Sequence, residues 1–199
     1  MTSISALRRP RFAIPLTVAA IVVISITAWC MLRPERHQHC IKSAIFILFG
    51  YANEHGGTYP KSDRGWGDAM LSFASGPDDT NWVRFFVGVD DDGAHLIRAL
   101  KTGEDVIEEQ CTRIYVQGLT EKSDSGIAIL FDRESVKGGD HFRGLPGQQR
   151  LREVITVGGT HQMIKDPEWP SFVARQRKLL RNEGFADSEI SRYYGPEKN

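Results

Sequence analysis

The sequence predicts an α+β protein with an N-terminal transmembrane helix, an amphipathic helix packed on a small antiparallel sheet, and a C-terminal helix. Three observations support this fold class. Residues 13–32 form an uncharged apolar run, apolar residues recur at helical spacing in residues 37–54, and short β-branched segments separated by turn residues follow. The predicted division is a tail at 1–12, an anchor at 13–32 and one domain at 37–199.

The apolar run from Ala13 to Leu32 is twenty residues long. A helix of that length measures about 30 Å, the thickness of the hydrocarbon core of a bilayer. A cleaved signal peptide is the alternative, but Trp29 before Cys30 does not fit a small-residue cleavage site. Three arginines precede the run and two follow it, with a glutamate between them. We therefore expect a single-pass protein of the cytoplasmic (inner) membrane, with the N-terminus inside and the domain outside.

Charge and composition limit the partners of the domain. The whole chain carries 25 basic and 25 acidic residues; removing the first 36 residues takes away five arginines and one glutamate and leaves 20 against 24. This slightly acidic domain has no basic stripe, so we expect no nucleic-acid partner. The expected partners are the membrane and other proteins of the cell envelope.

The first predicted element of the domain is a helix over residues 37–54. Apolar residues recur there at spacings of three and four, at positions 41, 44, 45, 48, 49 and 52. Gly56 and Gly57 end the helix, and Pro60 prevents it from resuming. So broad an apolar face must be buried, against the sheet or partly against the membrane.

The remaining elements are predicted from periodicity and turn residues. Short helices are expected over residues 68–73 and 94–101. Strands are expected over residues 82–89, 112–119, 126–131, 153–157 and 160–164. The last two strands form a hairpin through Gly158-Gly159. Ser171 is predicted to cap a helix running to about residue 182, and Asp187 to cap a last turn.

Cysteine usage leaves two readings open. Cys40 and Cys111 lie far apart in the domain and are candidates for a disulfide if the domain is exported. The alternative is two buried thiols. No Cys-x-x-Cys occurs, which argues against a zinc ribbon or a thioredoxin-type site.

Histidines and carboxylates suggest only weak sites. Asp140, His141 and His161 would converge if the glycine-rich loop folded over the last hairpin, as in an envelope enzyme or a metal- or ligand-binding domain. A structural role for His161 is the favoured interpretation. The acidic turn at 90–92 does not match a calcium loop, and the pair of histidines before Cys40 lacks the spacing of a metal site. No nucleophile or phosphate-loop motif occurs, so we predict no catalytic residue and no cofactor.

Two stretches resemble the pseudopilin-like proteins of type II secretion and type IV pilus systems, closest to their "G" class. Residues 50–60, GYANEHGGTYP, are similar to that family's helix with its acid-His-Gly-Gly-x-aromatic-Pro exit. Residues 138–141 and 154–161 are similar to its closing loop and hairpin. The resemblance implies a pilin-like fold and a structural, interaction role in a secretion or pilus-type assembly.

The chain also departs from this family. Family members are cleaved after Gly, leaving a terminal Phe and a Glu five residues in. Here Phe12 follows Arg11, and the fifth position is Leu16. Pro34 interrupts the long helix that pilins use as a spine. The expectation is therefore a pilin-like domain on an uncleaved anchor.

Overall fold

The computed structural model describes residues 21–22, 24–25, 40–88, 91–138 and 148–197. It divides the chain into two units at residues 35 and 36, and all the elements below belong to the second. Those elements are, in chain order, α2 (Ile41–Glu54), α3 (Trp66–Leu71), α4 (Val83–Phe86), α5 (Ala94–Thr102), the 3-10 turn η2 (Glu108–Gln110), β1 (Arg113–Tyr115), β2 (Ala128–Asp132), β3 (Val136–Lys137), β4 (Arg150–Thr156), β5 (His161–Lys165), the 3-10 turn η3 (Asp166–Glu168), α7 (Trp169–Asn182) and α8 (Asp187–Tyr194).

The predicted α+β class and antiparallel sheet are confirmed. Following the pairings from strand to strand gives β1-β2-β4-β3. Strand β5 also pairs with β4 but lies off this path. Each pairing is antiparallel, with Ile114 opposite Phe131 in β1–β2 and Ile155 opposite His161 in the final hairpin. Gly158-Gly159 forms the turn of that hairpin, as predicted, and Gly159 has the positive φ (74°) that a tight turn requires.

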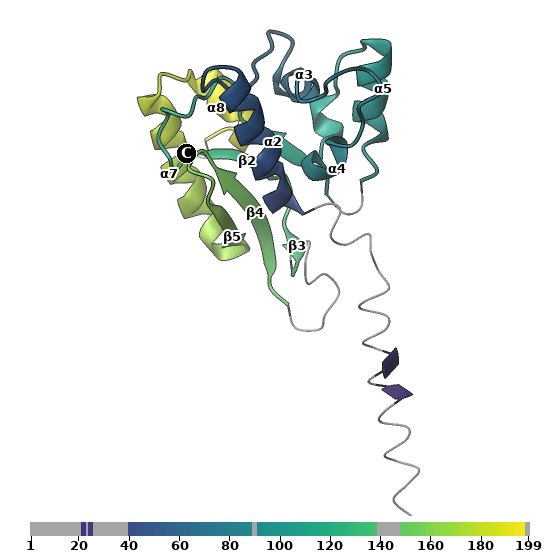
Figure 1. Ribbon diagram of the computed structural model, residues 1–199. Helices are drawn as coiled ribbons and strands as arrows, with labels where there is room; N and C mark the ends of the chain where they lie inside the picture. The colour runs from purple at the N-terminus through teal and green to yellow at the C-terminus, as the bar shows by residue number, and fades with distance from the viewer. Residues whose placement is uncertain (1–20, 23, 26–39, 89–90, 139–147, 198–199) are drawn as a thin grey trace, which may run out of the picture. The chain divides into compact units, whose positions relative to one another are not determined.

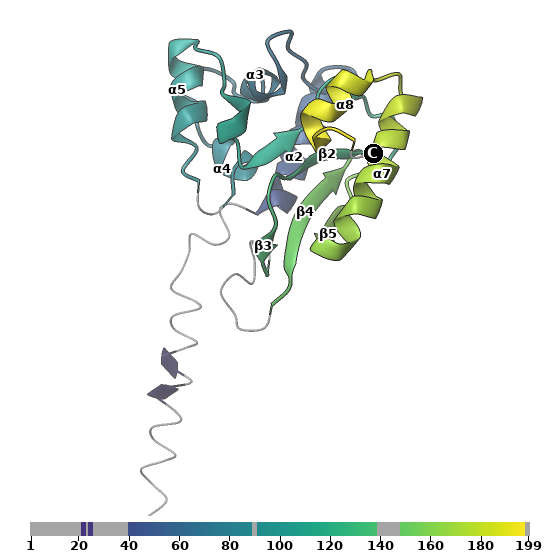
Figure 2. The same cartoon turned by 180° about the vertical axis from the view of Figure 1, so that it is seen from behind.

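Helices cover both faces of the sheet. Figure 1 shows α2 in front of β2 and β4, and Figure 2, from behind, shows α7 and α8 over the opposite face. On that second face Phe131 of β2 stacks on Tyr194 of α8, with ring centroids 5.0 Å apart. All five residues of β2 are consequently buried, as expected for a strand between two layers.

Helix α2 forms because its apolar residues recur at helical spacing and bury one side of the helix. Ile41, Ala44, Leu48 and Ala52 recur at spacings of three and four, and all four are buried. The backbone N–H of Gly57 donates to the carbonyl of Ala52 at 2.7 Å, which closes the last turn. The predicted helix and its glycine end are confirmed from residue 41 onward, and the predicted start at residue 37 lies outside the described residues.

The predicted membrane anchor is corrected by the structure. Within the described residues no helix is long and apolar enough to cross a membrane. The longest helices, α2 and α7, have 14 residues each, about 21 Å against the roughly 30 Å of a bilayer core. The single-pass topology and inner-membrane localisation predicted from residues 13–32 are therefore not supported. Most of that run lies outside the described residues.

Within the segment predicted as a strand at 82–89, Val83–Phe86 form the helix α4 instead. Val83, Phe86 and Val87 are buried at spacings of three and one, a helical pattern, while Arg84 is exposed. The aromatic and β-branched composition suggested a strand, but packing of Phe86 against Phe73, with stacked rings 4.8 Å apart, selects the helical turn. Tertiary packing overrides β-propensity here.

The C-terminal helices are present with different starts. Helix α7 begins at Trp169 and has Pro170 in its first turn, so Ser171 lies inside the helix and does not cap it. At α8 the capping position is Ala186, one residue before the predicted Asp187, and its N–H donates to the Glu189 side chain at 3.0 Å. Local sequence therefore located the starts of these helices within three residues.

A buried ion pair connects the sheet to α4. Arg113 of β1 is fully buried, and its Nε donates to Oδ1 of Asp132 at 3.1 Å. Its Nη1 donates to the carbonyl of Phe85 at 2.8 Å, and the backbone N–H of Glu153 donates to Asp132 at 2.7 Å. The pair thus joins β1, β2, β4 and α4 at one point of the core.

Candidate functional site

The two domain cysteines are thiols in the structure and are not joined to each other. Cys40 is half-buried directly before α2, and Cys111 is buried directly after η2. The disulfide between Cys40 and Cys111 therefore stays a prediction.

His161 is held by a carboxylate of the neighbouring strand. Its Nε2 lies 3.0 Å from Oε2 of Glu153, whose side chain is almost fully buried. In the hairpin register Glu153 lies opposite Met163, which makes His161 its diagonal neighbour. The sequence could have indicated this pair, because the predicted Gly-Gly turn fixes which residues of β4 and β5 lie opposite each other. Asp140 and His141, predicted to join His161, lie outside the described residues.

The acidic turn before α5 caps that helix. Asp91 accepts a hydrogen bond from the N–H of Gly93 at 2.8 Å, and Asp92 accepts one from Ala94 at 2.9 Å. These carboxylates satisfy donors at a helix start, where negative charge is also favourable.

Among the residues that the structure describes, no group of three or more His, Cys, Asp or Glu side chains is placed to hold a metal ion.

The structure brings together one group of side chains that the sequence analysis did not predict. In it a thiol lies next to an imidazole, and the imidazole lies next to a carboxylate. Cys111 Sγ lies 3.6 Å from Nε2 of His95, and His95 Nδ1 lies 3.9 Å from Asp91 Oδ1. Asp91 comes from the turn before α5, His95 from α5 itself, and Cys111 directly follows η2. Their order is that of thiol-based catalytic arrays. Only the spacing of Asp91 and His95, four residues apart at a helix start, hinted at it.

The thiol of this constellation is not prepared for nucleophilic attack. The Cys111 residue is 1% exposed, and burial raises its pKa to about 12, against a smaller opposite effect of Arg133. The attacking species in cysteine chemistry is the thiolate, which such a group does not form near neutral pH. The constellation therefore joins α5 to β1 by polar contacts and packing.

The most unusual surface feature lies on α2. Opposite its buried stripe the helix presents Phe46, whose residue is 80% exposed. At 100° per residue, the exposed residues around Phe46 form one side of the helix, which we call the outward face of α2. The outward face comprises the exposed residues Lys42, Phe46, Gly50, Asn53 and Glu54 and, beside them, the half-buried Ser43.

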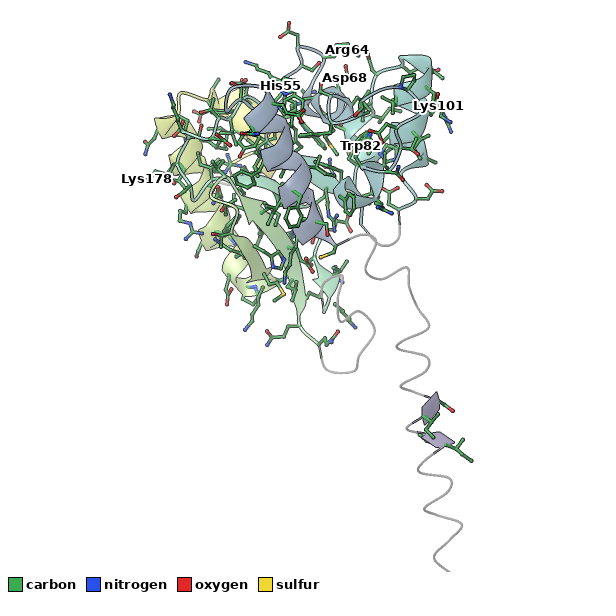
Figure 3. The ribbon with its side chains drawn as sticks, in the orientation of Figure 1. His55, Arg64, Asp68, Trp82, Lys101 and Lys178 are labelled. Atoms are coloured by element: carbon green, nitrogen blue, oxygen red, sulfur yellow. The ribbon has the colours of Figure 1, made fainter. Side chains whose placement is uncertain are left out.

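Gly50 makes a hollow beside Phe46 on this face. Among the residues that the structure describes, nothing lies within 4 Å of a Cβ atom built on Gly50, so their packing does not require a glycine there. Glycine inside a helix costs about 1 kcal/mol relative to alanine. A large exposed aromatic ring and a helix position without a side chain thus lie one turn apart. At the end of this helix, His55 (labelled in Figure 3) stacks on Tyr51 with ring centroids 3.8 Å apart.

Comparison of the chain with protein-family models, with curated proteins and with solved structures finds no match. The resemblance to pseudopilin-like proteins in residues 50–60 therefore stays a prediction.

Proposed function

We propose that this chain is a structural, protein-binding component of a larger assembly, and that it binds through the outward face of α2. The 80% exposure of Phe46 is the observation that supports this proposal. The resemblance of residues 50–60 to pseudopilin-like proteins suggests the class of assembly, of the secretion or pilus type. The thiol–imidazole constellation at Cys111 gives no comparable support for chemistry, because its thiol is buried and protonated.

The outward face has the composition of a small binding site. Burying a phenylalanine side chain is worth about 1.5–3 kcal/mol, which Phe46 does not gain from the part of the chain that the structure describes. Aromatic residues are enriched at protein interfaces, where an apolar centre is surrounded by a polar rim. Here Lys42 and Glu54 lie at the two ends of the face and Ser43 and Asn53 beside its centre, all outside the core.

Site-specific photocrosslinking in the native host tests this function. A photoreactive phenylalanine analogue placed at position 46 is expected to crosslink to one defined protein. The matched control carries the analogue at Lys178, an exposed position of α7 (Figure 3). Substitution of Gly50 by Glu in the position-46 variant fills the hollow with a charged side chain and is expected to abolish the adduct.

The proposal is contradicted if position 46 gives no adduct or the same adducts as position 178. It is also contradicted if the Gly50→Glu substitution leaves the adduct unchanged, because the hollow would then not belong to the binding site. Circular dichroism of each variant verifies that the fold is retained. Retention is expected because both substituted positions of α2 point away from the core.

A further inference from the structure

The outward face of α2 is complementary to itself. We infer that its binding partner is a second copy of this chain, with the two α2 helices packed antiparallel about a twofold axis at the level of Leu48. This inference rests on the proposed function and names the partner of the same face. Twofold contacts require that residue i of one copy meets residue j of the other and that j meets i.

An axis at this level gives a specific set of opposite residues. Phe46 and Gly50 are equally far from Leu48 along the helix, about 3 Å each, so each Phe46 lies over the hollow of the partner's Gly50. No heavy atom of the described residues lies within 4 Å of a Cβ built on Gly50, so this position is open to a ring from outside. Ser43 lies opposite Asn53, two side chains that hydrogen-bond to each other readily.

The same register pairs opposite charges. Lys42, the second residue of α2, lies opposite Glu54, the last, and the symmetry forms this pair twice. A parallel arrangement in the same register would place Lys42 against Lys42 and Glu54 against Glu54. Charge complementarity therefore favours the antiparallel arrangement.

Each of these charges lies at the less favourable end of its own helix. A helix N-terminus carries partial positive charge and its C-terminus partial negative charge, so a lysine in the first turn and a glutamate in the last are both disfavoured. Helix α2 has no acidic residue in its first turn and no basic residue in its last. An antiparallel partner brings Glu54 to the N-terminus and Lys42 to the C-terminus, which reverses both unfavourable contacts.

The expected association is weak and reversible. Helix α2 is about 21 Å long, and stable interfaces usually bury at least about 1,200 Å² in total, more than one helix pair of this length supplies. Sedimentation velocity of the purified full chain over a concentration series is therefore the appropriate measurement, with monomer and dimer in exchange.

A charge exchange tests the register. Lys42→Glu places two glutamates opposite each other at both symmetric positions and is expected to raise the dimer dissociation constant about tenfold. Glu54→Lys should act in the same way with two lysines. The double variant Lys42→Glu/Glu54→Lys restores the opposite charges and should return the dissociation constant to within about threefold of the parent chain. Phe46→Ala, the variant without the central ring, should weaken the dimer at least about tenfold.

These results separate the inference from its alternatives. Weakening by both single charge variants with recovery in the double variant supports the antiparallel pair, because association through any other segment would not respond to this exchange. A chain that stays monomeric up to about 1 mM, or dimers without recovery, overturn it. If the monomeric chain still crosslinks from position 46 to a different protein, the second copy is excluded as partner and the proposed function stands. If position 46 crosslinks to nothing, both fail.

Discussion

Two helical glycines in opposite surroundings make a sharp test of the packing described above. Gly50 lies in α2, and an added Cβ would meet no described residue within 4 Å. Gly50→Ala should therefore gain the helix propensity of alanine without a steric cost, about 1 kcal/mol. For a domain of this size, that gain raises the melting temperature by about 2–4 °C.

Gly67 in α3 is the matched opposite case. A Cβ there would lie 2.7 Å from Cγ1 of Val106 and 3.0 Å from its Cβ, closer than real Cβ contacts come. Gly67→Ala must displace the valine, and such overpacking usually costs about 1–3 kcal/mol. Because Gly67 is near the start of a short helix, the propensity gain is smaller there. We expect a net loss of at least about 1 kcal/mol.

Urea unfolding followed by tryptophan fluorescence compares the two variants with the parent chain. Low protein concentration keeps any association through α2 out of the measurement. The expected result is a higher transition midpoint for Gly50→Ala and a lower one for Gly67→Ala, with similar slopes. A lower midpoint for Gly50→Ala would show that its side of α2 is occupied. A raised midpoint for Gly67→Ala would refute the packing of α3 against Val106.

Three further predictions follow from buried polar groups. Asp132→Ala leaves a buried arginine without its carboxylate and should cost about 3–5 kcal/mol in urea unfolding, whereas Asp105→Ala, at an exposed pair, should cost less than about 1 kcal/mol. Burial raises the pKa values of Tyr59 and Tyr193 from 10.0 to about 12. Their protonated forms therefore stabilise the fold fully below pH 10, and this stabilisation is lost as the pH rises from 10 to 12. Thermal melts across that range should show the loss, and tyrosinate absorbance below pH 11 that disappears when Tyr59 or Tyr193 is replaced by Phe would contradict it. Cys111 should be alkylated at pH 8 only as fast as the chain unfolds, which peptide mass spectrometry measures; rapid alkylation of native protein would refute its burial.

Local signals in the sequence located the elements whose structure depends on neighbouring residues. The Gly158-Gly159 turn, the glycine end of α2 and the cap of α5 at Gly103 each follow from backbone conformations that glycine adopts easily. The strand predicted at 82–89 failed because Val83 and Phe86 suit a strand or a helical turn equally well. Contacts with residues distant in sequence selected the helix.

The candidate sites divide in the same way. The pair of Glu153 and His161 follows from the register of the hairpin, which its own turn fixes. The meeting of Cys111 with His95 depends on how η2 packs beside α5, and no spacing in the sequence fixes that. The sequence by itself determined that residues 41–54 form a helix with apolar residues on most sides, because helical periodicity is a property of neighbouring residues. Only the tertiary structure decided which side of the helix faces the core, because the sheet on which α2 packs determines which residues are buried. This packing leaves Phe46 and Gly50 side by side on the outward face.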